Sequence, residues 1–137
     1  VGHELGHHKG KHIQKLIIIS IVYELMIFYL TNILYKFFIT KNFLGLSQPY
    51  TAFVYAFLFI NIIMYFLTPF VNYLSRKFEY ESDNYSAKLL GTPMPLIKAL
   101  KRLVKQNLSN PNPLPIYKLW HYTHPAPEER IKNLLQE

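Results

Sequence analysis

Two long apolar segments constrain the fold of this chain more than any other feature of its sequence. They cover residues 16–38 (LIIISIVYELMIFYLTNILYKFF) and residues 50–70 (YTAFVYAFLFINIIMYFLTPF). As an α-helix the first would be about 35 Å long, enough to cross a hydrocarbon layer about 30 Å thick, and the second has about the same length. We interpret both as transmembrane helices, because two neighbouring runs of this length are rare as the buried helices of a soluble protein.

The segment between the two runs, ITKNFLGLSQP, contains turn residues at Asn42, Gly45, Ser47 and Pro49. The two helices therefore form a hairpin whose outer ends lie on one side of the membrane. The formal net charge is +7, and basic residues that flank apolar runs favour membrane lipids with anionic headgroups as partners. Basic residues are more numerous at the outer ends than at the turn: Lys9, Lys11, Lys15, Arg76 and Lys77 against Lys36 and Lys41. The positive-inside rule therefore predicts that the outer ends face the cytoplasm.

The rest of the sequence predicts further helices. Residues 1–15 contain no proline, and residues 71–90 form a polar helix that ends before Gly91 and Pro93. A short amphipathic helix over about 95–107 is followed by the loop SNPNPLP, and a last helix covers 128–136 with Pro127 near its start. The expected fold class is all-α, with residues 1–137 forming part of one integral-membrane domain.

The first twelve residues, VGHELGHHKGKH, suggest a metal site. The chain has no cysteine, so a metal must be held by His, Asp or Glu. His3, Glu4 and His7 form the pattern H-E-x-x-H. On a helix the two histidines lie one turn and about 40° apart, so both imidazoles can bind one ion, and Glu4 can take a proton from a zinc-activated water.

His8 and His12 are a second pair with the same spacing. They project roughly 140° and 180° away from His3 if the helix continues. The residue after His8 is Lys9, which can neither accept a proton from water nor favour a nearby dication. We therefore interpret His8 and His12 as surface or headgroup histidines.

A third ligand is expected from the segment FEYESD, residues 78–83. Glu79 and Asp83 share a helix face, whereas Glu81 points away from both. The hairpin brings residues 1–12 and 75–90 to the same side of the membrane, so we predict Glu79 as the third ligand. Asp83 suits an acceptor for the ring N–H of a ligating histidine. The alternative is a solvated acidic helix face.

The three motifs HELGH, SRKFEYESD and WHYTHPAPEER, in this order around a membrane hairpin, resemble the type I CAAX prenyl proteases. The resemblance implies a gluzincin-like site with one Zn²⁺ per chain on His3, His7 and Glu79, and Glu4 as general base and acid. It assigns His124 to the substrate carbonyl or oxyanion and Arg130 to the polar network of the site. Ser82 stands where the family more often has alanine.

The chain begins at Val1, only two residues before His3, so we expect it to be the C-terminal third or so of a longer protein. In the family, N-terminal helices close a water-filled chamber and help to bind substrate. We expect residues 1–137 alone to be inactive without that part as a partner.

The predicted function is zinc-dependent cleavage of peptide bonds near the C-terminus of prenylated CAAX-type proteins. The alternative is a membrane quality-control protease of the same superfamily without prenyl specificity. A non-catalytic scaffold with a relic site is disfavoured, because a relic has no reason to keep Glu4. Nucleic-acid binding is not expected, since Lys98, Lys101, Arg102 and Lys105 follow the spacing of one solvated or lipid-facing helical stripe.

Overall fold

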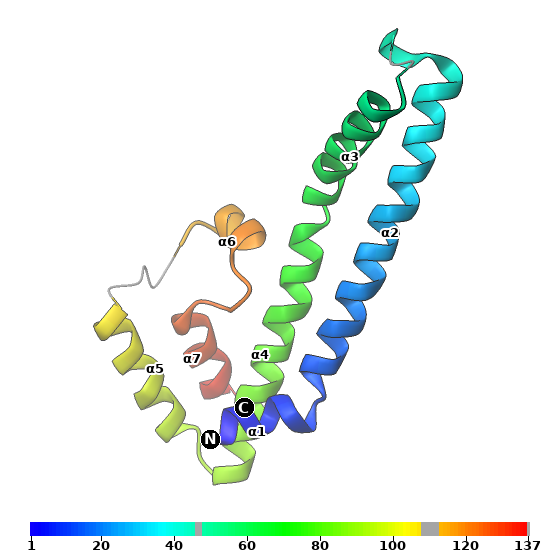
Figure 1. Cartoon of the computed structure of the whole chain (residues 1–137). Coiled ribbons are helices and arrows are strands. Elements are labelled where there is room, and N and C mark those ends of the chain that lie inside the picture. Colours follow the sequence, from blue (N-terminus) through cyan, green and yellow to red (C-terminus); the bar gives the residue numbers. More distant parts are fainter. Residues whose placement is uncertain (46–47, 108–112, 137) are drawn as a thin grey trace. The chain divides into compact units, whose positions relative to one another are not determined.

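The computed structural model describes residues 1–45, 48–107 and 113–136, without the side chains of residues 106 and 107 (Figure 1). Every regular element of these residues is helical, which confirms the all-α prediction. The elements are α1 (Gly2–Lys9), α2 (His12–Lys41), the short 3₁₀ helix η1 (Phe43–Gly45), α3 (Pro49–Tyr65), α4 (Thr68–Leu90), α5 (Met94–Asn107), α6 (Pro115–His121) and α7 (Pro127–Gln136). Ser47 of the predicted turn and residues 109–112 of the predicted proline loop lie outside the described residues.

The chain divides into two compact units. An apolar unit comprises residues 17–68, and a polar unit comprises residues 1–16 together with 69–137.

In the apolar unit α2 and α3 run side by side in opposite directions, joined through η1 (Figure 1). Phe38 of α2 packs on Ala52 and Ala56 of α3, whose small side chains let the two helices approach closely. Large apolar side chains cover the outer surface of α2, and Phe28 is 71% exposed. Such a surface suits contact with lipid or with further apolar helices.

The first predicted crossing, residues 16–38, lies within α2, which is long and apolar enough to span a membrane. The second predicted crossing, residues 50–70, is not one continuous helix. α3 ends at Tyr65 and α4 begins at Thr68, and the two pass the same test only as one broken span. Pro69 explains the break, because it has no N–H to bond the Tyr65 carbonyl and its ring crowds the preceding turn.

In the polar unit α1 packs closely on α4. Gly2 and Gly6 stand one helical turn apart on α1 and face Ser86 and Ser82 of α4. A β-carbon on Gly2 would lie 2.6 Å from Ser86 Oγ, so there is room for only small residues at this contact. The close approach of the two backbones brings the side chains of α1 within reach of the acidic residues of α4.

The helix predicted over residues 1–15 is interrupted. α1 ends at Lys9, α2 begins at His12, and Lys11 adopts the left-handed backbone conformation with φ of 52°. This turn changes the direction of the chain and so changes which way His12 points.

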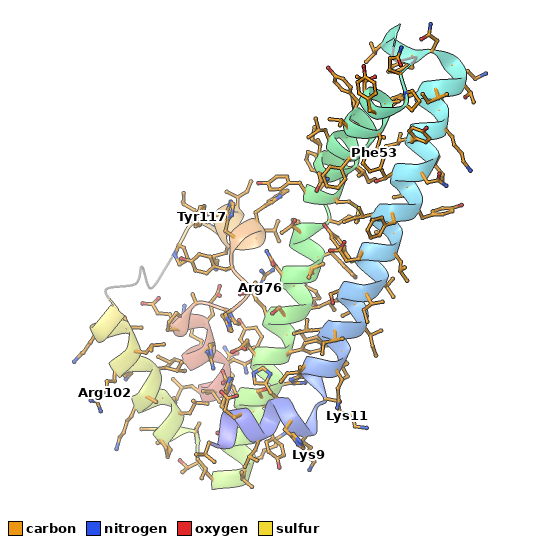
Figure 2. All side chains as sticks on the ribbon, in the orientation of Figure 1. Lys9, Lys11, Phe53, Arg76, Arg102 and Tyr117 are labelled. Atoms are coloured by element: carbon orange, nitrogen blue, oxygen red, sulfur yellow. The ribbon has the colours of Figure 1, made fainter. Side chains whose placement is uncertain are left out.

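The C-terminal helices are fixed to α4 by polar contacts. Arg76 of α4 points toward α6 (Figure 2) and donates to the carbonyl oxygens of Lys118 at 3.3 Å and Tyr122 at 2.7 Å. Asn72 donates to the Trp120 carbonyl at 2.7 Å. These bonds satisfy carbonyls at the end of α6 and thereby place the loop that carries His124.

α7 begins at Pro127, one residue before the predicted start, and packs through Leu134 on Ile97 and Leu100 of α5. The backbone N–H of Ala126 donates to the carboxylate of Glu129 at 3.1 Å, half of a capping box. This cap fixes the first turn of α7, which holds Arg130.

Candidate metal centre

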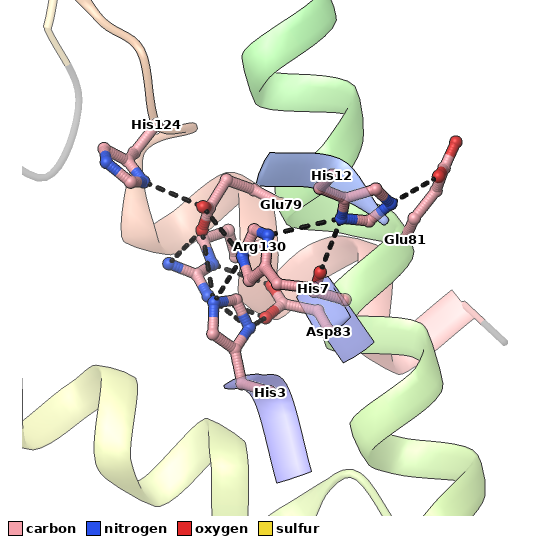
Figure 3. A network of polar contacts seen from close by, with 9 residues as sticks. His3, His7, His12, Glu79, Glu81, Asp83, His124 and Arg130 are labelled. Carbon is pink, nitrogen blue, oxygen red and sulfur yellow. Dashed lines mark hydrogen bonds and ion pairs between the residues drawn. The ribbon is translucent and has the colours of Figure 1, made fainter. Parts of the chain in front are cut away.

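Three side chains from α1 and α4 converge on one point (Figure 3). The Nε2 atoms of His3 and His7 lie 3.2 Å apart. The Glu79 carboxylate lies 3.2 Å from His7 Nε2 and 3.5 Å from His3 Nε2. One ligand atom from each residue can be chosen so that all three lie within 4.8 Å of one another.

These separations fit a zinc ion. Tetrahedral bonds of about 2.0–2.2 Å place neighbouring ligand atoms about 3.3–3.6 Å apart. The donor set of two imidazoles and one carboxylate is also that of catalytic zinc sites with one open position. The arrangement therefore suits one metal ion held by three protein ligands.

Asp83 orients His3. The Nδ1 atom of His3 lies 2.8 Å from Asp83 Oδ1, so the ring donates there and turns Nε2 toward the shared point. Arg130 holds the same carboxylate with two bonds, from Nε at 2.7 Å and from a terminal nitrogen at 2.6 Å. Burial alone would raise the pKa of Asp83, but the bonds from Arg130 and His3 outweigh it and hold the pKa below its ordinary value of 3.8. Asp83 is thus ionised near neutral pH, which strengthens it as an acceptor.

Arg130 and His124 both contact the Glu79 carboxylate. A terminal nitrogen of Arg130 lies 3.3 Å from Oε2, and His124 Nδ1 lies 3.0 Å from Oε1. The His124 side chain is 66% exposed, so its ring stands at the open edge of the site. The structure thus brings both residues of the third motif to the predicted ligands.

Glu4 is exposed and lies between the two predicted ligand histidines in sequence. Burial lowers the pKa of His7 below its ordinary value of 6.5, although Glu79 and, more weakly, Glu4 raise it. The neighbouring side chains of His3 and His12 lower the pKa of His7 in the same direction as burial. His7 is therefore neutral near pH 7, which is the form that binds a metal.

His12 corrects the sequence interpretation. It is not a surface histidine: it is 1% exposed and lies 3.2 Å from His7, Nδ1 to Nδ1. The turn at Gly10 and Lys11 brings its ring back toward α1, which helical periodicity alone could not indicate. His8 is exposed, as expected for a surface histidine.

Glu81, which was expected to point away from Glu79 and Asp83, contacts His12 Nε2 at 3.1 Å.

A pocket of about 490 Å³ adjoins the site. Its walls are Leu100 and Leu103 of α5, the segment 121–125, and Pro127 and Arg130 of α7. His124 and Arg130 thus face both the converging ligands and a space large enough for part of a peptide.

The sequence matches Peptidase family M48 over residues 1–137. It is 34% identical over 142 residues to the CAAX prenyl protease 1 homolog of Homo sapiens, across 98% of this chain and 29% of that protein. It is 28% identical over 141 residues to the uncharacterized metalloprotease YhfN of Bacillus subtilis, across 100% of this chain and 33% of that protein. The crystal structure of S. mikatae Ste24p matches with a TM-score of 0.78 at 28% identity, across 97% of this chain and 33% of that one. The chain spans about a third of the length of these proteins.

Proposed function

Because the chain belongs to peptidase family M48, we propose that it carries the zinc centre of a membrane endopeptidase that cleaves prenylated proteins near their CAAX C-termini. The family implies a metal ion, and the match to Ste24p together with the apolar helix α2 indicates a membrane protein. The resemblance to type I CAAX prenyl proteases drawn from the three motifs is confirmed. The observation that carries the proposal is the convergence of His3, His7 and Glu79 on one point.

His3, His7 and Glu79 would hold one Zn²⁺ per chain. When bound, zinc would supply Lewis-acid activation of the attacking water and of the scissile carbonyl. Glu4 takes the proton of the water and passes it to the leaving amine. His124 and Arg130 donate hydrogen bonds toward the negative charge that develops on the carbonyl oxygen. Asp83 keeps His3 in the tautomer that ligates.

The pocket beside His124 supports a peptide substrate. Its apolar walls, Leu100 and Leu103, suit aliphatic side chains of the kind found in a C-a-a-X sequence. We propose that the rest of the longer protein completes the binding site, since the relatives extend well beyond the matched region. Membrane lipids are a further proposed partner, and the balance of basic residues supports an active site on the cytoplasmic side.

The test uses the intact protein in detergent with Glu4→Gln beside it. Bound zinc per chain and cleavage of a farnesylated C-a-a-X peptide and its unprenylated twin are measured. The proposal expects zinc in both forms, cleavage by the parent alone, and dependence on the lipid.

Equal cleavage of the two peptides would favour a quality-control protease without prenyl specificity. The match to YhfN, whose name specifies a metalloprotease and no prenyl substrate, makes this outcome worth testing. A parent without zinc would overturn the metal centre itself.

A further inference from the structure

His12 is held rigidly although it is outside the set of converging ligands. Its ring stacks on Phe78 with centroids 4.5 Å apart and planes within 8°. The ring occupies the space that a side chain at position 10 would fill, because a β-carbon on Gly10 would stand 2.2 Å from His12 Nε2. With 1% of its surface exposed, His12 is buried as deeply as a core residue. An imidazole fixed this tightly can direct hydrogen bonds.

The contacts of His12 define its tautomer. Glu81 accepts from Nε2 at 3.1 Å, so Nε2 carries the ring proton. The Nδ1 atom is then the acceptor, and two groups point at it: Ser82 Oγ and His7 Nδ1, each at 3.2 Å. His7 therefore donates through Nδ1, and its Nε2 keeps the lone pair that faces Glu79 and His3.

We propose that His12 is the positioning residue of His7, and that it acts as a histidine bridge between this ligand and the Glu81 carboxylate. The inference rests on the proposed function, because it assumes that His7 Nε2 binds the metal. Each ligating histidine then has its own support: His3 donates to Asp83, and His7 donates to His12, which in turn donates to Glu81. Groups that orient ligating histidines in this way raise metal affinity and activity.

Ligation by His12 itself does not fit the contacts. Both of its ring nitrogens are engaged, one by Glu81 and the other by His7 and Ser82. The cluster of possible ligands in the described residues contains His3, His7 and Glu79 without His12.

Two substitutions separate the hydrogen bond from the packing. His12→Phe keeps a ring that can stack on Phe78 but removes the acceptor for His7. His12→Asn removes the ring but can place an amide oxygen near the position of Nδ1. His8→Phe is the matched control, because His8 is exposed and lies on the same segment.

The intact protein is purified in detergent, and its zinc affinity is measured by competition with a chromophoric chelator. We expect His12→Phe to weaken zinc binding by about 10–100-fold, as loss of such outer partners does. His12→Asn should retain more of the affinity than His12→Phe, although its metal-free form should unfold at a lower temperature. Glu81→Gln keeps an oxygen that can accept from His12, so this variant should bind zinc more tightly than Glu81→Leu. At saturating zinc, steady-state kinetics of His12→Phe should show a larger change in kcat than in KM.

The outcomes are distinguishable. If the parent binds zinc and the zinc affinities of the two His12 variants rank in the same order as their thermal stabilities, His12 serves packing alone and the inference is wrong. The inference is also wrong if His12→Phe binds zinc as tightly as His8→Phe. A parent that binds no zinc would instead overturn the proposed function and the inference with it.

Discussion

Gly6 and Ser82 approach so closely that a β-carbon on Gly6 would stand 2.7 Å from the Ser82 Cα and 2.9 Å from its carbonyl oxygen. Both atoms belong to the backbone of α4 and cannot rotate away. Gly6 lies between His3 and His7 in sequence, and Ser82 lies between Glu79 and Asp83. The contact therefore sets the distance between the two halves of the candidate metal centre.

We predict that Gly6→Ala pushes α1 away from α4. Overpacking of this kind should cost about 1–3 kcal/mol of stability. A displacement approaching 1 Å at the ligands should also lower kcat/KM by about 100-fold. Thermal unfolding and peptide cleavage by the intact protein measure the two effects. Leu5→Ala, a change at an exposed position of the same helix, should alter stability by less than about 0.5 kcal/mol. A Gly6→Ala variant that matched Leu5→Ala in both assays would contradict this account.

The Asp83–Arg130 pair leads to a second prediction. Asp83 is fully buried and receives two bonds from Arg130. Arg130→Met should destabilise the protein by about 3–5 kcal/mol, because it leaves a buried carboxylate without its cation. Adding Asp83→Asn removes that unpaired charge. The double variant should therefore lose less stability than the sum of the losses in the two single variants. Chemical denaturation of the three variants measures the coupling.

Lys132→Met provides the matched control on the same helix, since Lys132 is exposed. It should change the free energy of unfolding by less than about 0.5 kcal/mol. Strict additivity of Arg130→Met and Asp83→Asn would show that the pair is not coupled.

Glu129 gives a prediction on pH. Burial alone would raise the pKa of Glu129, but bonds from Lys118 and from the Ala126 N–H outweigh it and hold the pKa below its ordinary value of 4.5. The folded protein therefore releases this proton more readily than the unfolded chain. The resulting stabilisation is fully present above about pH 4.5 and is lost as the pH falls through the lower, folded-state pKa.

The difference in stability between the parent and Glu129→Gln should accordingly shrink as the pH is lowered below about 4.5. Thermal unfolding of both forms between neutral and acid pH measures this difference. Because the comparison is between two forms of one protein, the other carboxylates contribute equally to both. A difference that stayed constant over the acid range would refute the role of Glu129 as a charged cap.

Much of the candidate metal centre could be predicted from helical spacing. His3 and His7 share one face of α1, and Glu79 and Asp83 share one face of α4, so each pair could be placed from its i, i+4 separation. The expectation that residues 1–12 and 75–90 lie close together came from the hairpin, and the contacts of His3 with Glu79 and Asp83 agree with it. The roles proposed for His124 and Arg130 depended on the family resemblance, because neither residue belongs to a periodic pattern.

His12 was missed because periodicity was carried through a turn. A continuous helix would point His12 away from His3, but the left-handed conformation at Lys11 redirects it. Gly10 was the available signal, since a glycine near the end of a helical pattern often marks its end. The break in the second predicted crossing was missed for a similar reason. The apolar sequence continues through residues 66–70, but Pro69 interrupts the helical hydrogen bonding of the backbone.

The last prediction concerns metal removal and separates the two histidine pairs. Under the proposed function zinc binds only the folded protein, so at a free concentration 100 times Kd it should add about 2.7 kcal/mol of stability that a chelator removes. His7→Ala should abolish most of this gain, because it deletes one of the three proposed ligands. His8→Ala should retain it, because His8 is exposed and lies outside the cluster. Glu4→Gln should also retain the gain while losing cleavage, since the proposed role of Glu4 is to take the proton and not to bind the metal. Thermal unfolding with and without chelator measures all four proteins. Equal chelator-induced shifts in His7→Ala and the parent would exclude His7 as a ligand, and a lost shift in His8→Ala would assign the metal to the other pair.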